Sequence, residues 1–155
     1  MRILLMGNPN VGKSVIFSRL TGVHVVTSNY PGTTVNYNCG HMKLGGEQVE
    51  VIDVPGTYTL EPTCEAEEVA LRLLDSGDVV VNVLNANNLE RNLYLTLQLL
   101  ERKVPVVVAL NMWDDTQHLG IHIDLNRLRG ILRVPVIPTV ATTGEGSKEL
   151  VENLA

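Results

Sequence analysis

Short runs of apolar residues alternate along the chain with segments in which apolar residues recur every three or four positions. Four to eight consecutive apolar residues suit a buried strand, whereas the second pattern predicts an amphipathic helix. The expected strands are 2–6, 34–43, 48–53, 78–84, 104–110 and 134–138. The expected helices are 13–21, 65–75, 90–103, 125–132 and 147–155. This alternation is typical of an α/β fold with a mostly parallel sheet and helices on both faces.

One turn interrupts the parallel order. Gly45 and Gly46 lie between the second and third expected strands and predict a hairpin, so one of the six strands is expected to be antiparallel. The 155 residues are enough for one domain with a sizeable core, and we interpret 1–155 as a single domain.

Composition and charge exclude several partners. The formal net charge is −5 and Lys and Arg do not cluster, which disfavours nucleic acid. The two cysteines, Cys39 and Cys64, lack C-x-x-C spacing, which favours reduced thiols and a cytoplasmic location. The longest apolar stretch, 104–110, is far shorter than the roughly 20 residues that a membrane-spanning helix needs. We therefore expect no direct membrane insertion by this chain.

The segment from Gly7 to Ser14 reads G-N-P-N-V-G-K-S and stands between the first expected strand and the first expected helix. It matches G-x-x-x-x-G-K-S, the phosphate-binding loop of nucleotide triphosphatases. Lys13 is expected to reach the β- and γ-phosphates, and the Ser14 hydroxyl is expected to ligate Mg²⁺. The alternative is a glycine-rich turn that binds nothing. The residues expected to contact nucleotide here are Asn8, Pro9, Asn10, Val11, Gly12, Lys13, Ser14 and Val15.

Two further motifs each follow an expected strand. Asp53-Val54-Pro55-Gly56 suits a carboxylate that holds Mg²⁺ through water, with the Gly56 N–H bonding the γ-phosphate. The run from Asn111 through Met112 to Asp114 reads N-x-x-D. A carboxylate there accepts hydrogen bonds from the N1–H and 2-amino group of guanine, a donor pair that adenine lacks. The alternative is an ordinary Asn/Asp turn. A third interpretation, an ATP-dependent kinase built on the same phosphate loop, conflicts with the N-x-x-D motif, because this motif favours guanine over adenine.

Two loops complete the expected site. The segment 28–34 reads as an exposed loop, expected to be mobile until a γ-phosphate orders it. It offers Thr33 and Thr34, either of which can add a hydroxyl to Mg²⁺, and spacing does not choose between them. After the last strand, the loop with Val140, Ala141 and Thr142 is expected to contact guanine through backbone N–H groups.

With these motifs in order, the chain resembles a small GTPase domain of the TrmE/Era-like group. More closely, it is similar to the N-terminal cytosolic G domains of FeoB, the bacterial ferrous iron transporters. The resemblance rests on GNPNVGKS at 7–14, NYPGTTV at 29–35, DVPGTYTL at 53–60, NLERNLYLTLQLLE at 88–101, PVVVALNMWD at 105–114, and VPVIPT before GEG within 134–146. It implies a Ras-like P-loop GTPase that converts GTP to GDP and phosphate, serves ferrous iron uptake, and has the transporter's membrane domain as its partner.

The resemblance also implies roles for single residues. Thr34 would be the Mg²⁺-sensing threonine, and Asn10 would coordinate K⁺, as in potassium-stimulated relatives. Lys13, Thr34, Gly56 and Asn10 would therefore be the catalytic residues. Thr57 follows Gly56 where Ras has a glutamine, and Arg72 and Arg91 are interpreted as solvated surface residues, so slow hydrolysis is expected. The alternative is a nucleotide-sensing binding module with negligible turnover.

The chain departs from the family pattern at three positions. Asn85 stands where the family usually has Asp. Val140 and Thr142 replace the usual Ser and Arg or Lys around Ala141, which predicts weaker contacts to guanine. The family's helical domain and membrane pore are not in this sequence. The expectation is a piece of a full-length transporter, at the cytoplasmic face of the inner membrane, or a solitary relative.

Overall fold

A central sheet carries the fold in this computed structural model, which describes residues 1–22 and 24–155. Across those residues seven strands lie in the order β2-β3-β4-β1-β5-β6-β7. β3 pairs antiparallel with both β2 and β4, and the other pairings are parallel. The strands are β1 (Arg2–Gly7), β2 (Val26–Asn29), β3 (Asn36–Leu44), β4 (Glu47–Asp53), β5 (Val79–Asn85), β6 (Val106–Asn111) and β7 (Val136–Pro138).

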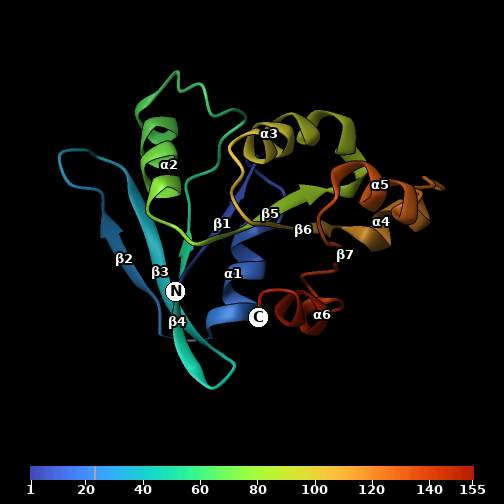
Figure 1. Cartoon of the computed structure of the whole chain (residues 1–155), viewed down its shortest axis with the longest axis horizontal. Coiled ribbons are helices and arrows are strands. Elements are labelled where there is room, and N and C mark those ends of the chain that lie inside the picture. Colours follow the sequence, from blue (N-terminus) through green and yellow to red (C-terminus); the bar gives the residue numbers. More distant parts are fainter. Residues whose placement is uncertain (23) are drawn as a thin grey trace.

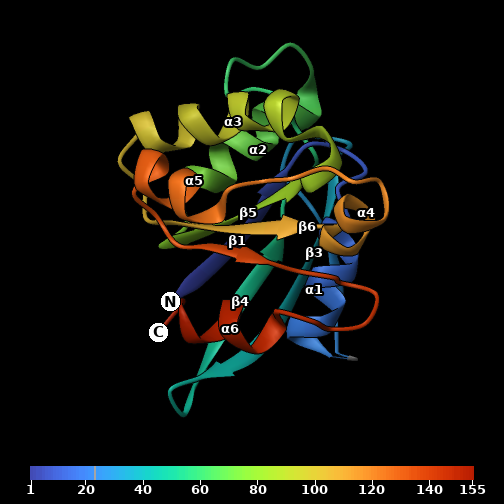
Figure 2. The ribbon, with the colours of Figure 1, turned by 90° about the vertical axis from the view of Figure 1, so that its right-hand side faces the viewer.

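Helices cover both faces of this sheet, as Figures 1 and 2 show, with α2, α3 and α5 on one side and α1 and α6 on the other. They are α1 (Lys13–Thr21), α2 (Glu65–Asp75), α3 (Leu89–Glu101), α4 (Trp113–His118), α5 (Leu125–Leu132) and α6 (Ser147–Glu152), with a 3₁₀ turn, η1 (Ala86–Asn88). None of the described helices combines the length and apolar character needed to cross a bilayer.

The central strands are apolar on both sides because each side faces a separate core. In β1, Leu4 and Met6 enter the core beneath α2, α3 and α5. Ile3 and Leu5 enter the core beneath α1 and α6, and all four side chains are fully buried. A parallel strand buried on both faces reads as a continuous apolar run. This explains why such runs, and not alternating patterns, predicted these strands.

The predicted α/β class, the mostly parallel sheet, its single antiparallel strand and the helices on both faces are confirmed. The number of strands is wrong, because β2 adds a seventh. β2 is a mostly exposed edge strand with no apolar run, and its hydrogen bonds come from pairing with β3. Part of the segment 28–34 predicted as loop, Ser28 and Asn29, belongs to this strand.

Most helix bounds are close to the prediction. The helices predicted at 13–21, 65–75 and 125–132 match α1, α2 and α5 residue for residue. The one predicted at 147–155 ends at Glu152. α4 was not predicted, because six residues are too few to show a helical period.

The parallel order brings the motifs to one edge of the sheet. β1 leads into the phosphate loop, β4 ends at Asp53 and β6 ends at Asn111. The register sets Leu5 of β1 opposite Asp53, and Asn85 of β5 opposite Asn111. Ligands of open α/β sheets bind outside the carboxyl ends of the strands. The fold thus assembles residues more than 100 positions apart in the sequence.

A buried polar pair ties α3 to the centre of the sheet. Thr96 donates its hydroxyl to Asn82 Oδ1 at 2.5 Å, and Asn82 Nδ2 donates to the Met6 carbonyl at 3.2 Å. Both side chains are fully buried. The Asn82 amide therefore depends on these partners, since water does not reach it.

We expect Thr96→Val to lower the free energy of unfolding by about 1–3 kcal/mol, because it leaves the buried Asn82 oxygen without a donor. Urea denaturation would measure the loss. The matched control is Thr27→Val. Thr27 makes the same kind of bond to Asn38, at 2.8 Å, on the exposed edge of the sheet. Water can replace that partner, so the control should change stability by less than about 0.5 kcal/mol. Equal losses in the two variants would contradict this account.

Candidate nucleotide-binding site

The loop between β1 and α1 turns in the left-handed backbone region at two positions. Asn10 has φ 66° and Gly12 has φ 84°. Asparagine tolerates this region and glycine prefers it, so the sequence suits the turn. A Cβ at Gly12 would overlap the Asn111 amide, and one at Gly7 would overlap the Val83 carbonyl. The loop backbone therefore needs glycine at both ends for close packing, and at Gly12 for turning as well.

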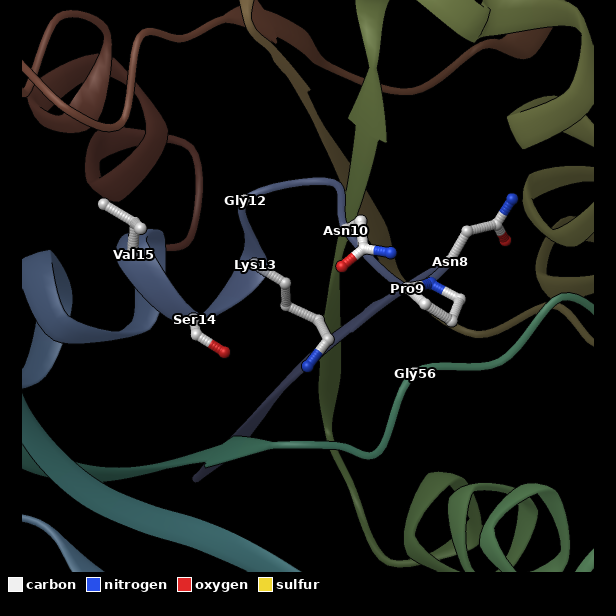
Figure 3. Close-up of a pocket in the computed structure, with 8 residues that line it drawn as sticks. All are labelled: Asn8, Pro9, Asn10, Gly12, Lys13, Ser14, Val15 and Gly56. Atoms are coloured by element: carbon white, nitrogen blue, oxygen red, sulfur yellow. The ribbon is translucent and has the colours of Figure 1, made fainter.

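This loop lines a cavity of about 390 Å³, together with Gly56 (Figure 3). Lys13 forms an ion pair with Asp53 Oδ1, and Ser14 donates its hydroxyl to Asp53 Oδ2 at 3.1 Å. Lys13 is the one cationic side chain among the described residues that line it. The hydroxyl of Ser14 and the carboxylate of Asp53 meet at one point, and oxygen donors of this kind suit Mg²⁺. Lys13, predicted to reach the phosphates, is thus brought together with Ser14 and Asp53, which were predicted to hold Mg²⁺.

A second cavity, of about 270 Å³, continues the first and shares Gly12 and Val15 with it. Asp114 lies in its wall, 100 residues from the phosphate loop in the sequence. The remaining predicted base-contacting residues also line it: Asn111, Met112, Val140, Ala141 and Thr142. The two cavities form a cleft with the Lys13 cation at one end and the Asp114 carboxylate at the other.

The Asn111 side chain joins the two ends of this cleft. Its Nδ2 donates to the Val11 carbonyl at 2.9 Å. Its Oδ1 accepts from the Thr139 hydroxyl at 3.0 Å and from the Ala141 backbone N–H at 3.1 Å. Asn111 is 2% exposed, so these bonds do not compete with water. The side chain therefore fixes the phosphate loop against the loop after β7.

Sequence reasoning missed a second connection between these loops. Arg19, in the last turn of α1, donates to the Ala141 carbonyl at 2.9 Å and to the Thr142 carbonyl at 2.5 Å. The two bonds hold the loop whose family-typical residues are replaced. Val140 packs into the interior and pairs with Glu145 through an isolated bridge. No motif marks Arg19, because an arginine on an amphipathic helix is usually solvated.

Asn85, the other departure from the family pattern, has a local role. Its Oδ1 accepts the Asn87 backbone N–H at 2.9 Å and so caps η1. Asparagine and aspartate both supply an oxygen for such a cap. The exchange of Asp for Asn therefore leaves the turn after β5 intact.

The two predicted Mg²⁺-sensing threonines lie outside both cavities. Thr33 donates its hydroxyl to the Tyr30 carbonyl at 2.8 Å. Thr34 is exposed, and both its backbone N–H and its hydroxyl donate to Glu65 Oε1, at 2.8 and 2.9 Å. These bonds, the backbone one foremost, lower the pKa of Glu65. Glu65 thus holds Thr34 towards α2.

The segment after Asp53 is anchored at Thr57. Its backbone N–H donates to the Gly7 carbonyl at 3.0 Å. Its hydroxyl shares one proton between the Thr59 carbonyl at 2.6 Å and Glu67 Oε2 at 3.0 Å. Glu67 also accepts the hydroxyl of Thr63 at 2.7 Å and its backbone N–H at 3.0 Å. These hydrogen bonds, led by the Thr63 hydroxyl, lower the pKa of the Glu67 carboxyl. One buried carboxylate therefore closes the loop between Gly56 and α2.

Comparison with known proteins connects this chain to one family. The family model described as "Ferrous iron transport protein B" matches residues 1–154. The Fe(2+) transport protein A/Fe(2+) transporter FeoB fusion protein of Porphyromonas gingivalis is 45% identical over 157 residues, covering 99% of this chain and 19% of that protein. The chain thus spans about a fifth of the length of the curated relatives it matches.

Solved structures give the same relationship. The cytosolic domain of L. pneumophila FeoB aligns with a TM-score of 0.93 at 41% identity, covering 99% of this chain and 67% of that one. A mutant S. thermophilus NFeoB bound to GDP aligns with a TM-score of 0.92 at 39% identity, covering 99% and 61%. The fold is therefore that of a Ras-like G domain.

The Glu67 network predicts a pH-dependent contribution to stability. Because the native pKa of Glu67 is lowered, the unfolded chain binds the proton first as the pH falls. The contribution is complete above about pH 5, where Glu is ionised in both states, and is lost as the pH falls through the native pKa. We expect Glu67→Gln to destabilise the protein by about 1 kcal/mol or more at pH 7.

Chemical denaturation at several pH values would test this. The difference between the parent and Glu67→Gln should shrink as the pH falls below about 5 and through the native pKa of Glu67, because the carboxylate becomes protonated. A matched control is Glu68→Gln, which removes an exposed carboxylate next along α2. A difference for Glu67→Gln that is constant with pH would show that its charge does not matter.

Proposed function

The chain belongs to the ferrous iron transport protein B family, and on that basis we propose that it binds GTP and GDP, hydrolyses GTP slowly, and acts as a nucleotide switch for ferrous iron uptake. The observation that carries the proposal is the cleft from Lys13 to Asp114, held together by Asn111. Its length and its chemistry suit phosphates at one end and a guanine base at the other. The GDP-bound S. thermophilus relative supports the same use of the fold.

The side chains of the cleft have separate roles in this proposal. Lys13 would exchange its ion pair with Asp53 for the β- and γ-phosphates, and the Gly56 N–H would bond the γ-phosphate. Ser14 and Asp53 would hold Mg²⁺, which when bound supplies positive charge to the phosphates. Thr34 would leave Glu65 to join them. Such exchange of one hydrogen-bonding partner for another is how a bound γ-phosphate orders a switch segment.

The wider context is also a proposal, because the curated relatives are about five times as long as the aligned region. We propose that the partner is the membrane transporter domain of the same full-length protein, at the cytoplasmic face of the inner membrane. The switch would then report nucleotide state to that domain through the segments around Thr34 and Thr57. Neither nucleic acid nor direct membrane contact by this chain enters the proposal.

We expect calorimetry to show that GDP binds at least about 100-fold more tightly than ADP. Adenine lacks the N1–H and 2-amino donors of guanine, so the Asp114 carboxylate would be left without hydrogen bonds. Asp114→Asn should shift the preference to xanthosine diphosphate, whose 2-position carries an oxygen. The matched control is Asp115→Asn, since Asp115 is an exposed carboxylate in the wall of the same cavity. Equal affinity of the parent protein for ADP and GDP would refute guanine recognition.

We further propose that Asn10 holds K⁺ beside the phosphates. Asn10 lines the phosphate cavity, and its amide oxygen is a suitable ligand for a monovalent cation. Thr57 is engaged by Glu67 and cannot replace a water-orienting glutamine. Added positive charge near the γ-phosphate would stabilise the transition state, where loss of one stabilising group typically costs about 10²–10³ in rate.

The left-handed backbone conformation of Asn10 determines which substitution can test its proposed role in holding K⁺. Alanine there costs roughly 1–2 kcal/mol of strain, whereas glycine removes the amide without strain. We expect GTP hydrolysis to be about ten-fold faster in potassium than in sodium at equal ionic strength, a tenfold change being 1.36 kcal/mol in the barrier. Asn10→Gly should lose most of this difference and keep its affinity for GDP. If Asn10→Gly weakens GDP binding equally in both salts, the Asn10 amide only stabilises the conformation of the phosphate loop and does not hold K⁺.

A further inference from the structure

A third cavity, of about 210 Å³, adjoins the phosphate cavity and shares Asn8, Pro9 and Asn10 with it. Its other walls include Tyr58, in the segment after Asp53, and Arg91, in the first turn of α3. Five of its nine lining residues are asparagines, so the space is polar. The proposed nucleotide chemistry uses neither Tyr58 nor Arg91, although both stand one loop away from the phosphates.

Arg91 and Tyr58 contact each other across this cavity. The guanidinium carbon of Arg91 lies 5.1 Å from the centroid of the Tyr58 ring, within the range of a cation–π interaction. Arg91 is the one cationic side chain among the described residues that line the cavity. Tyr58 is 45% exposed, so packing alone leaves its ring room to turn. From the sequence alone, we interpret Arg91 as a solvated surface residue. Its side chain is exposed, but it also contacts the Tyr58 ring, so that interpretation is incomplete.

The helix that carries Arg91 begins at a fixed place. The next residue, Asn92, accepts the Asn85 backbone N–H at 3.2 Å and donates to the Asn88 carbonyl at 2.8 Å. Asn92 is 3% exposed, so its two bonds are shielded from water. They join the start of α3 to the end of β5. Arg91 therefore reaches Tyr58 from a rigid base.

Tyr58 in turn stands beside the part of the loop that faces the phosphates. Thr57 is bonded to the Gly7 carbonyl, and a Cβ at Gly56 would lie 3.2 Å from Pro9. The space between Gly56 and Pro9 is thus too narrow for a side chain to fit without a shift. A change in the position of Tyr58 would therefore also move the backbone two residues earlier, at Gly56, whose N–H is proposed to bond the γ-phosphate.

The wall shared by the two cavities contains an unsatisfied acceptor. Asn8 is 5% exposed, and its Oδ1 is buried without a hydrogen-bond partner among residues 1–22 and 24–155. Figure 3 shows its side chain directed away from the Lys13 amine. A guanidinium carries five N–H donors, and Arg91 lines the same cavity as this wall.

We propose that Arg91 is a positioning residue for GTP hydrolysis, which holds Tyr58 and so keeps Gly56 and Thr57 against the phosphate loop. This inference rests on the proposed GTPase function. Arg91 acts through Tyr58 and not on the nucleotide. Its removal should therefore slow turnover and leave the affinity for GDP unchanged.

The kinetic test uses charge and ring variants of the whole chain. Arg91→Gln and Tyr58→Leu should each lower kcat about three- to ten-fold, with KM and GDP affinity within about two-fold of the parent. Arg91→Lys keeps the cation and Tyr58→Phe keeps the ring, so both should retain most of the activity. The double variant should be no slower than the slower single one. Arg72→Gln, which removes an exposed arginine from α2, is the matched control and should change nothing.

Hydrogen exchange of the protein without nucleotide gives a readout that does not need turnover. The amides of residues 56–60 should exchange faster in Arg91→Gln and in Tyr58→Leu, but not in Tyr58→Phe. Unchanged exchange in Arg91→Gln, multiplicative kinetic losses in the double variant, or a parallel fall in GDP affinity would each overturn the inference. If the parent protein hydrolyses no GTP, the proposed function fails, while exchange still reports whether Arg91 holds Tyr58.

Discussion

The cleft depends on one buried carboxamide. Asn111 donates to the phosphate loop at Val11 and accepts from Thr139 and Ala141 beyond β7. Only a side chain with a donor and an acceptor on one short stem makes both contacts, so neither aspartate nor leucine would serve. Gly12 is required for the same reason, since a side chain there would displace the amide. One buried side chain thus bonds directly to both ends of the cleft, and Arg19 adds a second, more exposed connection to the loop after β7.

The segments around Thr34 and Tyr58, which we expect to move, are held by weaker contacts than those of Asn111. The bonds of Asn111 are buried, whereas Thr34 is held to Glu65 by exposed hydrogen bonds that water can replace. Exposed backbone and side-chain bonds belong to the parts of a protein that open most easily. Tyr58 is half exposed and rests on Arg91. The loop after β7 is therefore held rigidly, whereas the segment around Thr34 is free to exchange its partners.

Much of this arrangement could be predicted from local patterns. Buried parallel strands are continuous apolar runs, and the phosphate loop and N-x-x-D have fixed spacing, so their order along the chain placed them at one sheet edge. The rest depends on tertiary contacts that leave no local signal. β2 is a strand because β3 pairs with it, and α4 is too short for a period. Arg19 and Arg91 look like any solvated arginine until the fold brings a carbonyl or a ring within reach.

The most direct test of the account is hydrogen exchange in the protein without nucleotide, comparing the parent with Asn111→Ala. If one carboxamide joins the two ends of the cleft, the amides of residues 10–14 and 139–142 should lose protection together. Thr96→Val removes another buried hydrogen bond, outside this junction, and should leave both segments protected. Faster exchange at only one of the two segments in Asn111→Ala, or a uniform rise throughout the chain, would contradict the central role of Asn111.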